Sequence, residues 1–161
     1  MKALLLIASK NEYIMASIYD TSDNAILIER IKNLNATSTP LWGKMSVDQM
    51  CEHCIAAINV AFGKQDLKIS FPMRLLGRLI KNKAFNSDFG KNSPTAKEFR
   101  ITSHSDFEKS QAQLIACVQE FAKGTSVITV MHHPFWGKMS FVDWDKLMWR
   151  HLGHHLRQFG V

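Results

Sequence analysis

The sequence lacks the features that would place it in a membrane or hold it together with disulfide bonds. Its longest apolar run near the start, residues 3–8, is far shorter than the roughly 20 residues of a membrane-spanning helix. That run is also shorter than the apolar core of about 7–15 residues in a signal peptide, and no clear small-residue cleavage site follows. The three cysteines are an odd number in a chain without a secretory signal. We therefore expect no membrane partner, a cytoplasmic location and free thiols.

Acidic residues are outnumbered by basic ones. The chain has 20 Lys and Arg against 14 Asp and Glu, a formal charge of +6 that favours anionic ligands or surfaces. The densest basic stretch, residues 74–83, alternates basic side chains with leucine and isoleucine at helical spacing. The simplest interpretation is an amphipathic helix whose basic side faces water, with a functional anion patch as the alternative. Nucleic acid is not an expected partner, because no recognition helix or aromatic and basic platform is visible.

Length and periodicity indicate one all-α domain. A chain of 161 residues that is 46% apolar fits a single domain with a real core. Residues 1–20 show no sustained period and no helix cap, so we expect an N-terminal extension there and a helical domain over 21–161. Residues 127–130 favour β structure but are too few for a sheet, which predicts an extended connection.

Five helices are expected in that domain. Capping boxes starting at Ser46 and Ser105 predict two of them, and Pro72 suits the first turn of a shorter one. The expected ranges are about 23–35, 46–62, 72–82, 105–123 and 140 almost to the C-terminus.

A short sequence occurs twice, each time directly before a helix that carries histidine. Residues 40–46 read PLWGKMS, and residues 134–140 read PFWGKMS. In each copy an apolar residue precedes the serine cap and would fix the angle at which the chain enters the helix. The repetition predicts two helix pairs related by a pseudo-repeat.

Two of the cysteines form a C-x-x-C motif within the second expected helix. Cys51 and Cys54 could be a redox pair, but such pairs lie at a strand-to-helix turn rather than inside a helix. Packing as small apolar residues on one helix face is the favoured interpretation.

The histidines suggest a metal site. His151 and His155 are four residues apart, which places both imidazoles on one face of the last helix. His154 would point elsewhere, and His53 is the only histidine in the middle of another expected core helix. Surface histidines recur at this spacing without binding anything, so the spacing alone leaves a metal site and a structural role open. Three histidine ligands would leave a coordination position for water, as in catalytic zinc sites.

These residues also resemble the DinB/YfiT-like superfamily, whose pattern is one His on an early helix and H-x-x-x-H near the end. The segments WGKMSVDQMCEHC (42–54) and HLGHHLRQFG (151–160) are most similar to a bacterial branch of unassigned function. The similarity covers about residues 23–161. It implies a four-helix bundle with long crossover connections, here with an additional short helix. It also implies that the metal ligands are His53, His151 and His155, held between helices near one end.

The resemblance implies a metal-dependent enzyme. Relatives include metal-dependent hydrolases and thiol-dependent transferases or isomerases that use bacillithiol, mycothiol or glutathione. We therefore expect one divalent ion, Zn²⁺ or Ni²⁺, that activates water or a small thiol for attack on a small-molecule substrate.

Three further residues are candidates for the surroundings of the site. Gln49 and Gln158 lie one turn from the ligand histidines and could be pocket or supporting groups, although helix-surface amides are the plainer interpretation. Trp144 could line a pocket or belong to the core. No acidic residue occupies a matching ligand position, so no general base is named. The alternative function is a non-catalytic metal-binding or interaction bundle, and a homodimer is compatible with either.

Overall fold

The structure, a computed structural model, describes residues 16–93 and 95–161. Within these residues the chain is almost entirely helical, as expected. Five α-helices are present: α1 (Thr21–Lys32), α2 (Val47–Ala61), α3 (Phe71–Asn86), α4 (Phe107–Phe121) and α5 (Phe141–Gln158). The remaining elements are the 3₁₀ turns η1 (Lys97–Phe99) and η2 (Thr125–Val127) and the two-residue strands β1 (His132–His133) and β2 (Gly137–Lys138). None of the described helices has the length and apolar character that a bilayer crossing requires.

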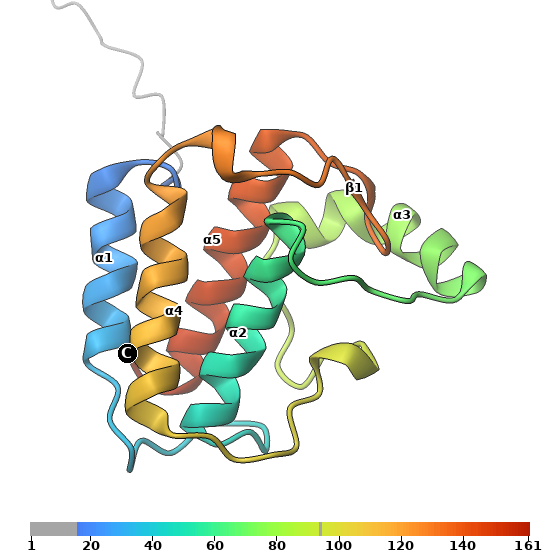
Figure 1. Ribbon diagram of the computed structural model, residues 1–161. Coiled ribbons are helices and arrows are strands. Elements are labelled where there is room, and N and C mark those ends of the chain that lie inside the picture. Colours follow the sequence, from blue (N-terminus) through green and yellow to red (C-terminus); the bar gives the residue numbers. More distant parts are fainter. Residues whose placement is uncertain (1–15, 94) are drawn as a thin grey trace, which may run out of the picture.

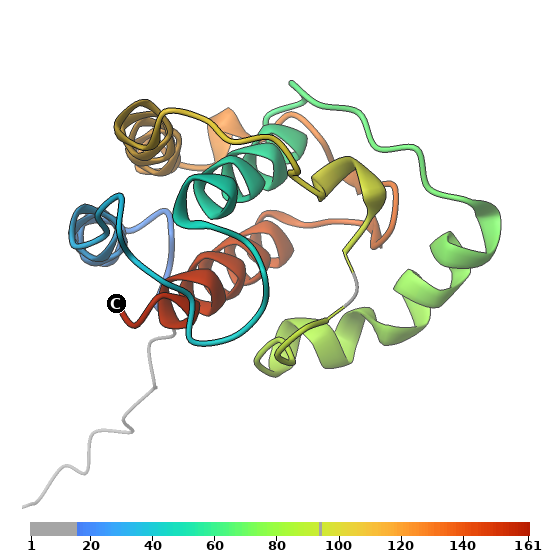
Figure 2. The same ribbon diagram turned by 90° about the horizontal axis from the view of Figure 1, so that it is seen from below.

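Four of the helices form the bundle, and α3 stands apart from it. Figure 1 shows α1, α2, α4 and α5 side by side, and Figure 2, the view from below, shows α3 beyond the α2 and α5 side of the bundle. The long connection from α2 to α4, residues 62–106, contains α3 and η1. The predicted four-helix bundle with a long crossover and an extra helix is therefore confirmed.

The core lies between the four bundle helices. Its largest fully buried side chains include Leu27 of α1, Ile58 of α2, Phe121 of α4, and Trp144 and Leu152 of α5. Apolar residues recur on one side of each helix at steps of three or four, so each helix presents a continuous apolar stripe inward. Burial of these stripes is the main force that holds the bundle together.

The N-terminal cap of α4 differs from the sequence-based prediction by one residue. Asp106, not Ser105, is the cap, and its carboxylate accepts a hydrogen bond from the backbone N–H of Lys109 at 3.0 Å. The Ser105 hydroxyl instead pairs with the hydroxyl of Ser110 at 2.9 Å. The expected capping box at Ser105 was wrong because the next residue offers an equally good cap.

Several other boundaries shift slightly. Helix α1 begins at Thr21, because the Asp20 side chain accepts from the backbone N–H groups of the first turn. Helix α3 continues to Asn86, four residues beyond the expected end. Residues 125–127 form the 3₁₀ turn η2, so the extended connection starts only after it. Of the expected N-terminal extension, residues 1–15 lie outside the described residues, and Ile18 is fully buried against the domain.

The two copies of the repeated sequence lead into α2 and α5, but the second copy contains the strand β2 and the first contains no strand. Gly43 and Gly137 both have positive φ, 83° and 76°, a conformation that favours glycine. At α5 the capping box is complete: Asp143 N–H donates to the Ser140 hydroxyl at 3.1 Å, and Ser140 N–H donates to the Asp143 carboxylate at 2.9 Å. The two copies therefore share a glycine of positive φ and a serine cap before the helix, while the pseudo-repeat of two helix pairs stays a prediction.

Candidate metal centre

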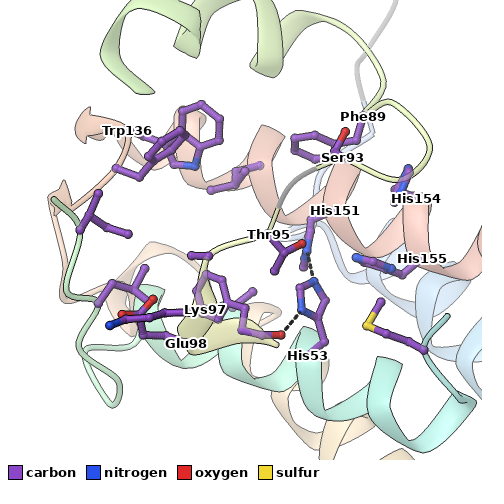
Figure 3. A pocket seen from close by; sticks show the side chains of 18 of the residues that line it. His53, Phe89, Ser93, Thr95, Lys97, Glu98, Trp136, His151, His154 and His155 are labelled. Carbon is purple, nitrogen blue, oxygen red and sulfur yellow. Dashed lines mark hydrogen bonds between the residues drawn. The ribbon is translucent and has the colours of Figure 1, made fainter. Parts of the chain in front are cut away.

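The three predicted ligand histidines meet between α2 and α5. His53 lies in the middle of α2, and His151 and His155 occupy successive turns of α5. Their candidate ligand nitrogens all lie within 4.8 Å of one another. His53 Nε2 and His151 Nε2 are 3.0 Å apart, and Figure 3 shows the three rings converging on one region. This three-histidine cluster could hold a metal ion.

Two of the rings are fixed in orientation by hydrogen bonds to their outer nitrogen. His53 Nδ1 donates to the carbonyl of Phe99 at 2.9 Å, an atom that can only accept. His155 Nδ1 donates to Gln158 Oε1 at 2.8 Å, while Gln158 Nε2 donates to the Trp42 carbonyl at 2.7 Å. Both imidazoles therefore carry their proton on Nδ1 and present the Nε2 lone pair to the cluster, which is the usual arrangement of metal-ligating histidine.

The surroundings keep the cluster uncharged. Burial lowers the pKa of His53, although the hydrogen bond to Phe99 opposes this. Burial and the neighbouring imidazoles hold the pKa of His151 well below its usual value. Burial and His53 lower the pKa of His155 to about 3. Neutral imidazole is the form that binds a metal ion, so the cluster is ready to bind at neutral pH.

The residues fit a divalent transition metal. In a tetrahedral zinc site, Zn–N bonds of 2.0–2.1 Å place neighbouring ligand nitrogens about 3.3 Å apart, close to the 3.0 Å between His53 and His151. His151 Nδ1 is the one buried side-chain nitrogen or oxygen without a hydrogen-bond partner among the described residues. The facing Nε2 atoms of two neutral imidazoles need a proton or a cation between them, which either the proton of His151 or a shared metal ion would supply.

The cluster opens onto a cavity of about 590 Å³, a size typical of small-molecule sites. His53 and His155 are buried, whereas His151 is partly exposed. Aromatic side chains make up much of the wall: Trp42, Phe89, Phe99, Phe135 and Trp136. Figure 3 shows Trp136 and Phe89 across the cavity from His53. The site can therefore hold an apolar molecule beside the three histidines.

His154 lies closer to the site than the sequence indicated. It stays outside the three-histidine cluster, as expected, but it lines the same cavity. Its ring lies 5.1 Å from that of His155 and 6.0 Å from that of Phe89. Helical spacing placed it on another face, but the loop carrying Phe89 extends the cavity over that face.

His133 also lines the cavity, although residue spacing did not indicate it. It lies in β1 and is only 5% exposed. Its Nδ1 accepts from the backbone N–H groups of Phe135 and Trp136 at 3.0 and 3.2 Å, so the proton is on Nε2. Burial, His132 and Lys81 lower the pKa of His133 to about 4. It is a neutral imidazole held in one tautomer by a turn that helical spacing cannot reveal.

The other candidate residues take structural positions. The Gln49 side chain accepts from Ser46 N–H at 3.1 Å at the start of α2, away from the cavity lining. Trp144 is fully buried in the core, and its indole N–H donates to the Val130 carbonyl at 2.6 Å. Cys51 and Cys54 are free and buried, and burial raises the pKa of Cys51 to about 12. Only Gln158 of the three supporting candidates contacts a cluster histidine.

A family model matches most of the chain. Residues 17–160 match the family described as a protein of unknown function (DUF1569), which is generally considered part of the DinB/YfiT-like superfamily. No curated protein and no solved structure matches the chain.

Proposed function

The chain belongs to the DUF1569 family, and from its site we propose that it is a metal-dependent enzyme acting on a small molecule. His53, His151 and His155 would hold one divalent ion, Zn²⁺ or Ni²⁺. The observation that carries the proposal is the orientation of His53 and His155, whose Nδ1 protons are engaged so that both Nε2 atoms face His151. Histidines with a purely structural role would not need to direct two Nε2 atoms toward a third histidine at the wall of a 590 Å³ cavity.

The cavity suggests how the chain would support a reaction. When bound, the ion would lower the pKa of water or of a small thiol and so promote its attack on an electrophile. The aromatic wall would hold the apolar part of the substrate and exclude bulk water. His133, with its proton on Nε2, would donate a hydrogen bond to a substrate acceptor. Glu98 is the only carboxylate among the described lining residues and is our candidate for the group that takes up a proton.

Metal content tests the site directly. We would measure it by plasma mass spectrometry on tag-free protein, as purified and after incubation with Zn²⁺ or Ni²⁺ and desalting. The comparison is wild type against the triple variant His53→Ala, His151→Ala, His155→Ala. A double variant of exposed histidines, His104→Ala, His132→Ala, is the control.

Near one equivalent of metal in wild type and control, and none in the folded triple variant, would support the site. Equal and negligible metal in all three proteins would refute it.

Metal-loaded protein should then be assayed with ester, amide and thiol-transfer substrates. His133→Phe should raise KM and Glu98→Gln should lower kcat, without changing metal content. Metal bound with no turnover in either reaction class would favour the non-catalytic bundle instead.

A further inference from the structure

Helix α3 exposes apolar side chains in addition to the basic ones that the sequence predicts to face water. We call one side of α3 its outer face; it consists of five side chains that are each between 38% and 78% exposed: Phe71, Leu75, Leu76, Leu79 and Ile80. The interpretation that the leucines face inward was wrong, whereas Arg74, Arg78 and Lys83 are exposed to water as expected. Monomeric proteins rarely expose a contiguous apolar surface of this kind unless it binds something.

The inner face of α3 is fixed by three specific contacts. Gly77 packs so closely on the Phe135 carbonyl that an added Cβ would lie 2.2 Å from its oxygen. The Lys81 ammonium group donates to the Asp143 carboxylate at 2.9 Å. Phe85 is buried, with its ring 5.2 Å from that of Trp136. These contacts determine which way the helix is turned, because they hold one side of α3 against the rest of the domain. Since α3 lies beside the bundle (Figure 2), its outer face is on the side away from these contacts.

The helix also carries charge of one sign only. Residues Phe71–Asn86 contain four basic side chains and no Asp or Glu. Lys81 is paired with Asp143, but no described carboxylate lies within ion-pair distance of Arg74, Arg78 or Lys83. The surface therefore combines exposed leucine and phenylalanine with uncompensated positive charge.

Charge decides between the candidate occupants of the outer face. A second copy docked through α3 would bring together two basic helices that contain no Asp or Glu, and their like charges would repel. A nucleic acid would satisfy the cations but leave the leucines uncovered. An anionic bilayer offers both an apolar interior and negative head groups, the combination that basic amphipathic helices bind.

We propose that the outer face of α3 docks onto an anionic lipid surface, with Phe71, Leu75 and Leu79 inserted among the acyl chains and Arg74, Arg78 and Lys83 near the head groups. This departs from our expectation of no membrane partner, which rested on the lack of a spanning segment. Ser70 and Met73, at the start of α3, also line the cavity beside the three-histidine cluster. Docking would thus hold the cavity mouth close to lipid. The proposal does not depend on the metal.

Vesicle co-sedimentation of the full chain tests the proposal. The probes are vesicles of phosphatidylcholine alone and of phosphatidylcholine with an equal part of phosphatidylglycerol, at low and at high salt. Wild type should bind the anionic vesicles at low salt, bind less as salt screens the charges, and bind phosphatidylcholine weakly. Leu75→Gln, Leu79→Gln should bind at least about tenfold more weakly, because buried leucine side chains supply much of the affinity.

The control variant replaces two apolar side chains of similar exposure elsewhere. Ile26 and Leu41 are 53% and 70% exposed, against 52% and 74% for Leu75 and Leu79. Ile26→Gln, Leu41→Gln should bind like wild type, and circular dichroism should show all three proteins folded. No wild-type binding at low salt, or equal binding by the α3 variant, would overturn the proposal. So would a wild-type dimer that the α3 variant abolishes while vesicle binding is unchanged.

Discussion

Gln158 connects the cluster to the loop that precedes α2. Its side-chain oxygen accepts from His155 Nδ1, its nitrogen donates to the Trp42 carbonyl, and it is only 4% exposed. One amide therefore sets the tautomer of a candidate ligand and positions the wall of the cavity. Outer partners of ligand histidines commonly affect metal affinity by about 10–100-fold.

We expect Gln158→Leu to weaken zinc affinity by about 10–100-fold, because His155 would lose the acceptor that holds its proton on Nδ1. Competition with a fluorescent zinc chelator would measure the change. Gln49→Leu is the matched control, since Gln49 caps α2 through Ser46 N–H. It should lower stability by about 1 kcal/mol and leave zinc affinity unchanged. Equal affinities in wild type and Gln158→Leu would contradict the supporting role.

Residue types and spacing predicted the cluster but not all of its surroundings. His151 and His155 follow from the helical period, and His53 from its position in a second helix. The Phe99 carbonyl and His133 could not be found in this way. Each reaches the cavity from a segment between helices, and the conformation of such segments depends on contacts that are distant in sequence.

At the scale of elements, the helical glycines Gly77 and Gly153 differ in the space that is available for a side chain. A Cβ at Gly77 in α3 would lie 2.2 Å from the backbone carbonyl oxygen of Phe135, which cannot move without shifting the β1–β2 turn. A Cβ at Gly153 in α5 would meet only the end of the Arg157 side chain, at 3.3 Å. That flexible group can move aside. The two positions should therefore respond differently to alanine.

Gly77→Ala should lower the free energy of unfolding by about 1–3 kcal/mol, because the added methyl group overpacks the contact between α3 and the turn. Gly153→Ala should raise it by about 0.5–1 kcal/mol, because alanine is the better helix former. Urea unfolding followed by circular dichroism would measure both. If Gly77→Ala were as stable as wild type, α3 would not pack on residues 134–136 as the structure shows.

Helix α3 also shows which features of an element cannot be predicted from the sequence pattern. Its existence and start follow from Pro72 and the apolar period. The rotation of the helix about its axis does not follow from them, because two of its sides are suited to packing. One side carries the apolar residues that are exposed, and the other carries Gly77, Lys81 and Phe85, which contact the rest of the domain. Which side faces the bundle depends on the loop at residues 134–136, far away along the chain.

At the scale of the whole molecule, the bundle holds several neutral imidazoles in its interior. The pKa of His133 is lowered to about 4 and that of His155 to about 3, and those of His53 and His151 are also lowered. In the unfolded chain these groups would take up protons below their ordinary pKa of about 6.5. The unfolded state then binds more protons than the folded state, so stability of the metal-free protein should fall as pH falls below about 6.5.

A bound metal should raise stability on top of this pH dependence. At a free metal concentration about 100 times Kd, binding adds about 2.7 kcal/mol, which corresponds to a rise in Tm of about 5–10 °C for a domain of this size. Because the lowered pKa values keep the folded cluster neutral, protons should compete poorly with the metal. We therefore expect the zinc-induced rise to persist from pH 7.5 to pH 5.5, while the metal-free Tm falls over the same range.

Thermal scans with and without Zn²⁺ at both pH values would measure the two effects together. The triple variant His53→Ala, His151→Ala, His155→Ala should show no zinc-induced rise at either pH, since it lacks the candidate ligands. A rise that is present at pH 7.5 and gone at pH 5.5 would mean that the folded imidazoles titrate near 6.5. Their low pKa values follow from burial of the cluster between α2 and α5. Such a result would thus show that water reaches the cluster more freely than the packing of these two helices allows.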